Sequence, residues 1–254
     1  MTDDSIWKLS SEFLKVPADQ VFLRVCKDDS EIYSKIQTEL KTEVALLDRT
    51  ITLLISTLQG VYSVKDKWAT DAQIRTAVAM AGAVLNCSLL IRHSLFLGYL
   101  SESIILIRYC HERTTRCLAF LGDAEIANKF LSNQQINQEK IDRAIRNLDE
   151  QLGPASYDGL RKIYDRLCEL SHPNLNSFSL RYGTDKLAET VGTNIVVGGI
   201  QSKHLAQSSI IFVLQHLLPI IRILQSKFTS QTGESEEEFK SLTNSLDTLK
   251  KSLY

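Results

Sequence analysis

Apolar residues recur every three or four positions along most of this chain, and that spacing restricts the fold more than any other feature. The longest such stripe predicts a helix from Ser30 to about Leu58, packed along one partner through Leu40, Val44, Leu47, Ile51, Leu54 and Leu58. Only 4 prolines and 11 glycines punctuate the 254 residues, so long helices are permitted almost throughout. We therefore expect an all-α protein folded as a helical bundle.

Caps and stop signals divide the rest of the chain into further helices. Asp71 can cap the helix that contains the most apolar run, and Gly98 and Gly122 mark helix ends. Pro173 disfavours helical conformation in the residue before it, and Pro219 should kink a long helix. The expected helices span residues 5–16, 18 onward, 72–98, 101–121, 123–132, 135–152, 156–171 and 201–227.

Two segments near the C-terminus have a different character. Residues 175–200 contain several Gly-Thr and Gly-Gly pairs and predict an irregular loop with a small hairpin. Ser235 and Glu238 form a capping-box pattern at the start of the last helix. That helix has a heptad seam, suited either to oligomerisation or to packing on the protein's own bundle: Phe239, Leu242, Leu246, Leu249 and Leu253.

Charge and hydropathy exclude several classes of protein. With a formal net charge of −1, the chain lacks the basic surface of a sequence-independent nucleic-acid binder, so a few arginines in one cleft must make any such contact. The most apolar run, Ala77–Ile91, is interrupted by polar residues and falls short of the ~20 residues of a membrane span. The five cysteines lie in apolar helical segments without CxxC spacing, as expected of buried reduced thiols. The acidic start of the chain has no signal-peptide core, so we expect a soluble, cytoplasmic protein with no membrane partner.

Known motifs supply little chemistry. The chain has no Walker-type phosphate loop, dinucleotide-binding glycine fingerprint, HExxH helix or nucleophile elbow. Its five histidines lack the Glu-x-x-His pairing of di-iron bundles. Cys110 and His111 are adjacent, and adjacent residues on a helix point about 100° apart. We expect no metal and no cofactor.

The segment before Pro173 carries a candidate pair, Arg166 and His172. Six positions apart, they would face different ways on a straight helix, but a helix that ends at His172 lets its side chain turn back towards the cleft beside Arg166. An arginine suits a phosphate, and a histidine at a helix C-terminus can hold a proton, so together they are sufficient for RNA cleavage without a metal. The structural alternative is a histidine that caps carbonyls and an arginine paired with Asp165 or Glu169.

A second pair, Arg108 and Glu112, lies one turn apart in an apolar helix expected at the centre of the bundle. Such a pair is either a buried structural ion pair or one wall of a polar cleft.

Two groups of residues carry a family resemblance. The first is Leu106-Ile107-Arg108, Glu112 and Leu118-Ala119-Phe120, and the second is the segment from Tyr164 through Arg166, Leu170-Ser171 and His172-Pro173 to Asn174. Over approximately residues 70–225 the chain resembles the HEPN-like superfamily, helical bundles often found in bacterial phage-defence and toxin–antitoxin systems. It is most similar to an uncharacterised bacterial branch with a Tyr…Leu-Ser…His-Pro helix end.

The resemblance implies a metal-independent endoribonuclease whose site is completed across a homodimer. Arg166 would bind the scissile phosphate of an RNA substrate, His172 would serve in acid–base catalysis, and Arg108 and Glu112 would orient the arginine. It also implies an antitoxin or another partner protein. Nuclease members usually have a polar residue after the arginine, where this chain has Leu167, which belongs to an apolar stripe.

The rival interpretation is a non-catalytic helical interaction protein or a nucleotide-binding module. Under either interpretation we expect three parts. Residues 1–65 form N-terminal helices that pack on the bundle, residues 66–228 form the HEPN-like helical core, and residues 229–254 form the C-terminal heptad helix.

Overall fold

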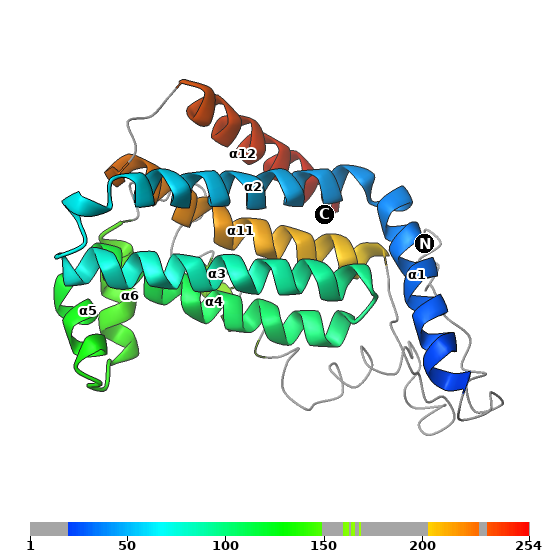
Figure 1. The fold of residues 1–254 in the computed structure, drawn as a ribbon, viewed down its shortest axis with the longest axis horizontal. Coiled ribbons are helices and arrows are strands. Elements are labelled where there is room, and N and C mark those ends of the chain that lie inside the picture. The colour runs from blue at the N-terminus through cyan, green and yellow to red at the C-terminus, as the bar shows by residue number, and fades with distance from the viewer. Residues whose placement is uncertain are drawn as a thin grey trace.

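Four long helices run side by side and contain most of the core: α2 (Lys41–Ser63), α3 (Ala72–Phe96), α4 (Leu100–Gly122) and α11 (Lys203–Phe228) (Figure 1). The structure is a computed structural model that describes residues 20–148, 160–162, 164–165, 168, 203–228 and 233–253. Within these residues every regular element is a helix, which confirms the predicted all-α bundle. The predicted helix at 5–16, the loop at 175–200, Arg166 and His172 lie outside the described residues.

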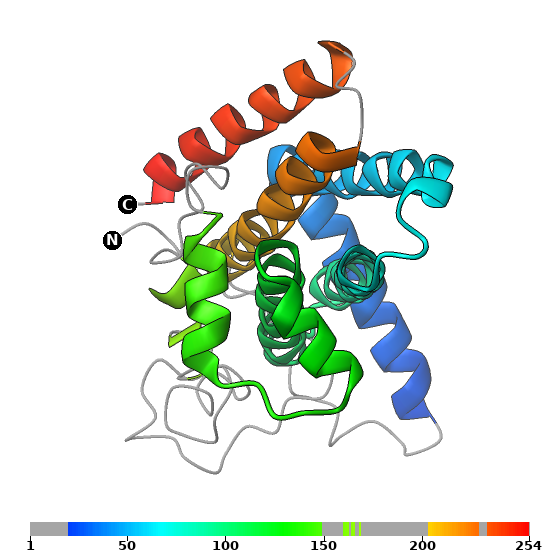
Figure 2. The ribbon, with the colours of Figure 1, turned by 90° about the vertical axis from the view of Figure 1, so that its left-hand side faces the viewer.

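Shorter elements close the two ends of this bundle. Helix α1 (Val21–Glu39) lies at an angle across one end, and α5 (Ala124–Leu131) and α6 (Gln138–Arg146) lie at the other (Figures 1 and 2). A short 3₁₀ turn, η3 (Lys65–Lys67), connects α2 to α3. The most extensive packing is between α3 and α4, and α11 packs against both α2 and α4. The central helices therefore share one core.

The prediction of one unbroken helix from Ser30 to Leu58 is wrong at Leu40. There the backbone adopts φ −114° and ψ 30°, which ends α1 and begins α2. The break lets α1 turn away from the axis of α2 while Ile32 and Ile36 still reach the core. The apolar stripe itself is confirmed, because all six of its residues are buried: Leu40, Val44, Leu47, Ile51, Leu54 and Leu58.

The signals predicted around α3 and α4 are confirmed with one correction. Asp71 caps α3, because its Oδ1 accepts a hydrogen bond of 3.2 Å from the Ile74 N–H. Gly98 has φ 81° in the turn between α3 and α4, a conformation that favours glycine. Gly122, predicted as a stop after the helix, is instead the last residue of α4. A Cβ there would collide with the backbone carbonyl of Ala144 in α6, so glycine is needed for close helix packing.

Three helices are long and apolar enough to cross a membrane by length and composition: α2, α3 and the Ala206–Phe228 part of α11. In the fold these helices pack on one another, and 72% of the most apolar window of α11 is buried within the protein. An ion pair also links two of them, since Arg92 of α3 contacts Asp48 of α2 at 2.5 and 2.9 Å. The corresponding windows of α2 and α3 are 56% and 44% buried, so the bundle's core uses most of the apolar surface of α11 and less than half of that of α3.

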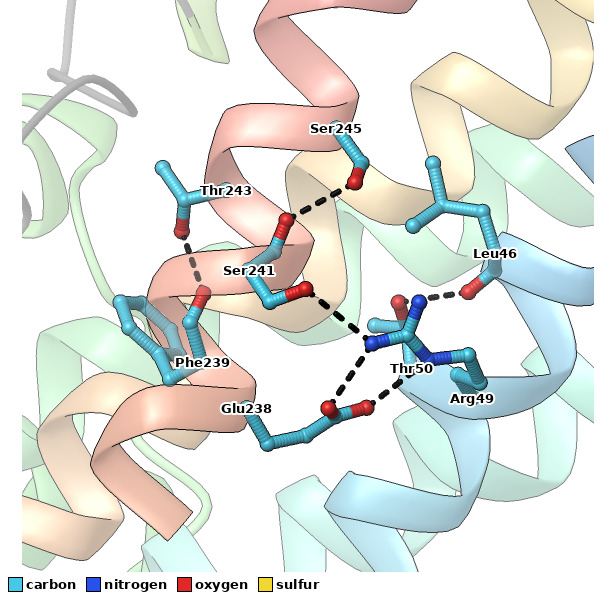
Figure 3. Close-up of polar contacts among 8 residues, drawn as sticks. All are labelled: Leu46, Arg49, Thr50, Glu238, Phe239, Ser241, Thr243 and Ser245. Carbon is cyan, nitrogen blue, oxygen red and sulfur yellow. Dashed lines mark hydrogen bonds and ion pairs between the residues drawn. The ribbon is translucent and has the colours of Figure 1, made fainter. Parts of the chain in front are cut away.

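The last helix, α12 (Gly233–Leu253), packs against α2 and α11 of the same chain. Leu242 and Leu246 of the heptad seam are buried there. The predicted capping box is wrong, because the helix begins two residues before Ser235. The Glu238 carboxylate instead accepts two hydrogen bonds, of 3.0 and 2.8 Å, from Arg49 of α2, as Figure 3 shows.

The cysteine prediction is confirmed in the core and wrong on α1. Cys87, Cys110 and Cys117 are buried in α3 and α4, whereas Cys26 is exposed and Cys168 is only partly buried. Cys26 lies on the end helix α1, which has only part of its surface against the bundle.

Candidate functional site

A pocket of about 630 Å³ opens beside the end of the bundle that α5 and α6 cover. Its walls come from α4, from the end of α5, from α6 with the connection that precedes it, and from Leu160, Arg161 and Tyr164. Its lining includes these polar and charged residues: His111, Glu112, Thr115, Arg116, Gln134, Gln138, Asp142 and Arg161. It also includes these apolar and aromatic residues: Phe130, Ile136, Ile141, Ile145, Leu160 and Tyr164. A pocket of this size and mixed lining suits a small amphipathic group.

Helix α6 forms its wall through a regular amphipathic face. Asn137 starts the helix by accepting a 2.9 Å hydrogen bond from the Glu139 N–H. Positions 138, 141, 142 and 145 then face the pocket at helical spacing. Across one turn of this face, the Gln138 amide donates to Asp142 at 2.8 Å, which holds both side chains in place.

A histidine of the pocket wall, His111, contacts a second histidine, His216, in the core behind it. His111 of α4 is 5% exposed and His216 of α11 is fully buried, and His111 Nδ1 lies 2.8 Å from His216 Nε2. His216 Nδ1 bonds to the backbone carbonyl of Phe212. Because a carbonyl only accepts, His216 carries its proton on Nδ1 and presents a bare Nε2 to His111. His111 must therefore donate from Nδ1.

Burial keeps both imidazoles neutral. It lowers the pKa of His216 to about 4, against a smaller opposing effect of the Phe212 hydrogen bond. Burial, then His216, and then the positive charge of Arg161 lower the pKa of His111 to about 2. The neutral, Nδ1-protonated form of His111 leaves its Nε2 as a bare acceptor on the residue that lines the pocket.

Tyr164 connects the 160–168 segment to α4. Its ring stacks on His111 with centroids 5.1 Å apart, and the Arg108 guanidinium lies 6.0 Å from the same ring. Arg108 also pairs with Glu112 at 3.5 Å. Hydrogen bonding with Cys168, and then burial, raises the pKa of the Tyr164 phenol. Of the predicted pair, Glu112 lines the pocket and Arg108 does not, and both side chains are partly exposed.

Two other arginines supply positive charge to the pocket. Arg161 lies 3.5 Å from Asp165, in a pair whose side chains are both well exposed, so solvent screens the contact strongly. Arg116 is exposed and makes no ion pair with any residue that the structure describes. Among the residues that the structure describes, the pocket therefore has one cation without an ion pair, Arg116, and one in a weak ion pair, Arg161, beside the buried imidazole of His111.

The structure brings together only part of the site predicted from sequence. Arg108 and Glu112 lie together, and Arg166 and His172 lie outside the described residues. The His111–His216 pair was missed, because the two residues are 105 positions apart and share no local motif. The available signal was His216 itself, a polar residue within the apolar stretch 210–224, since a buried histidine needs a hydrogen-bond partner.

No family model matches this chain, and no curated protein or solved structure matches it. Among the described residues, no three His, Cys, Asp or Glu side chains come together in a way that could hold a metal ion.

Proposed function

We propose that the protein is a HEPN-like helical protein that binds RNA in the pocket beside α4 and α6, and cleaves it without a metal ion. Arg116 carries the proposal: it is an exposed cation at the pocket with no ion pair in the described part of the chain. An arginine not committed to a carboxylate is available for a phosphate, which its planar fork binds through two hydrogen bonds.

The other lining residues support a nucleotide as the ligand. Arg161 supplies a second cation, and the rings of Tyr164 and Phe130 offer surfaces on which a base can stack. The chain's net charge of −1 agrees with recognition in one cleft and not along a basic surface.

The cleavage step of the proposal rests on Arg166 and His172. Arg166 would stabilise the charge that develops on the phosphate, and His172 would transfer protons. In support, the described part of the same segment packs on α4, where Tyr164 stacks on His111 and lies near Arg108.

The test is incubation of purified protein with RNA in EDTA, comparing wild type with Arg166→Ala, His172→Ala and Arg116→Ala. Arg143→Ala is the matched control, an exposed arginine of α6 outside the pocket. We expect cutting in chelator by wild type and by the control, and none by the Arg166 and His172 variants. Arg116→Ala should bind RNA at least about tenfold more weakly, the effect of one charge-assisted hydrogen bond. A folded wild type that binds RNA without cutting it would contradict the cleavage step and leave only the RNA-binding part of the proposal.

A non-catalytic interaction protein is the second candidate. Four large apolar side chains on α3 and α4 are between 44% and 55% exposed: Leu89, Leu90, Ile105 and Tyr109. Exposed apolar groups on neighbouring helices suit contact with another protein, such as a second copy or an antitoxin. Light scattering of wild type and Ile105→Lys tests this: a homodimer formed through these helices becomes a monomer in the variant.

A further inference from the structure

One atom in the pocket, Nε2 of His111, has no hydrogen-bond partner among the residues that the structure describes. The side chain is 5% exposed, and its Nδ1 is bonded to His216. No residue that the structure describes hydrogen-bonds to Nε2, although His111 lines the pocket. Nε2 is not one of the fully buried side-chain atoms left without a hydrogen-bond partner, so this acceptor is accessible from the pocket, where a ligand can bond to it.

The hydrogen bonds from the Phe212 carbonyl through His216 to His111 determine which kind of partner Nε2 can bind. The Phe212 carbonyl can only accept, which fixes the tautomer of His216, and His216 in turn fixes the tautomer of His111. Nε2 is then a lone pair with no proton, and it can accept a hydrogen bond but cannot donate one. A ligand must therefore bring a donor to this position.

The surroundings of His111 narrow the choice of donor. Arg161 is close enough for its charge to act on the imidazole, and Arg116 lies on the same helix just over one turn away, also at the pocket. The acceptor thus stands beside positive charge suited to a phosphate. A ribonucleotide carries that combination, because its 2′-hydroxyl donor and its 3′-phosphate are on adjacent carbons of the sugar.

We propose that His111 Nε2 accepts a hydrogen bond from the ribose 2′-hydroxyl of the bound nucleotide, and that this contact selects RNA over DNA. His216 is a positioning residue, since it acts only by holding the tautomer of His111. The inference rests on the proposed function, because it names how the same pocket recognises its ligand.

The binding test uses single-stranded oligo-uridine in ribose form and in 2′-fluoro form, which has similar size but no hydroxyl proton. Wild type should bind the ribose form about tenfold more tightly. His111→Asn keeps an amide N–H that can replace Nδ1 and loses the acceptor at Nε2, so its preference should fall to about onefold. His93→Asn is the matched control, an exposed histidine of α3 outside the pocket, and should retain the wild-type preference.

Other outcomes separate this inference from the proposed function. If wild type binds neither oligonucleotide, the proposed function fails and the inference fails with it. If His111→Asn binds and keeps the full ribose preference, only the inference fails. A comparison of oligo-cytidine with oligo-uridine tests a base amine as the donor: a cytidine preference that His111→Asn abolishes, without any ribose preference, overturns the 2′-hydroxyl assignment.

A measurement on the wild type avoids dependence on the folding of the variant. Nitrogen-15 NMR of the histidine side chains should show His111 protonated on Nδ1 and bare on Nε2. Its Nε2 resonance should move on adding the ribose oligonucleotide and stay in place with the 2′-fluoro form. A proton on Nε2 in the free protein, or equal shifts with the two oligonucleotides, overturns the inference.

Discussion

At Gly122 the absence of one carbon atom lets α6 pack against the end of α4, and so sets the distance between two walls of the pocket. We expect Gly122→Ala to lower the free energy of unfolding by about 1–3 kcal/mol, because the new Cβ meets the Ala144 carbonyl and backbone cannot move aside cheaply. Gly82→Ala in α3 is the control, since nothing lies within 4 Å of a Cβ there. It should be neutral or stabilise by up to about 1 kcal/mol. Urea denaturation distinguishes these results, and equal effects of the two changes would contradict the packing account.

The histidine pair makes stability depend on pH in a defined direction. Both folded-state pKa values, about 4 for His216 and about 2 for His111, lie below the unfolded value of 6.5. The unfolded chain therefore binds more protons as pH falls, so this stability is fully present above pH 6.5 and is lost as pH falls from there towards 4. Each histidine contributes a slope of up to about 1.4 kcal/mol per pH unit in that window.

Denaturation of wild type and His216→Leu between pH 7.5 and 4.5 measures that slope. The variant removes one titrating group from the core, and it also removes the effect of His216 that helps to lower the pKa of His111, so stability should fall less steeply with acidification. His93→Asn, a change at an exposed histidine, should retain the wild-type slope. Parallel curves for wild type and His216→Leu would show that this pair is not the source of the pH dependence.

At the scale of elements, burial and not the visible ion pair holds α12 on the bundle. Arg49 and Glu238 are 46% and 35% exposed, so solvent screening limits their contribution to no more than about 1 kcal/mol. Leu246, by contrast, is 4% exposed, and its truncation to alanine should cost about 2–4 kcal/mol.

Amide hydrogen exchange tests the attachment of α12 directly. Leu246→Ala should speed exchange along α12 more than along α3, while Arg49→Ala should change α12 only slightly. A larger effect of Arg49→Ala than of Leu246→Ala would show that the contacts drawn in Figure 3 dominate the docking of this helix.

At the scale of the whole molecule, apolar periodicity was enough to predict the fold class and most of the core. Leu47, Leu54 and Ile107 are fully buried, as their stripes predict. The break at Leu40 was not predicted, because both helices use the same residue as a core contact and no proline or glycine marks the boundary. Helix docking also went unpredicted: the choice of α12 between its own bundle and a second copy depends on three-dimensional fit, which heptad spacing does not encode.

The candidate site was predicted only where its residues are close in sequence. Arg108 and Glu112 are one turn apart, so their pairing follows from helix geometry. His111 meets His216 of a helix 105 residues away, and such a contact follows from packing. In the sequence, the one potential partner beside His111 is the adjacent Cys110, and that pair does not predict the contact with His216.

The packing of the three apolar helices bears on whether the protein lies in water or in a membrane. The most apolar window of α11 is 72% buried within the protein and that of α2 is 56% buried, against 44% for α3, and Asp48 of α2 pairs with Arg92 of α3. We therefore propose a cytoplasmic, water-soluble bundle and expect the full chain in the soluble fraction of lysed cells. Recovery only after detergent extraction of the membrane fraction would contradict this.

The proposed function depends on RNA binding in the pocket between α4 and α6. The direct measurement is photo-crosslinking of a single-stranded RNA containing 4-thiouridine, with the attached peptides identified by mass spectrometry. We predict adducts on the peptides that contain Phe130 and Tyr164, strongly reduced in Arg116→Ala and unchanged in Arg143→Ala. Adducts confined to α1 or α12, or none from a folded protein at saturating RNA, would contradict the account.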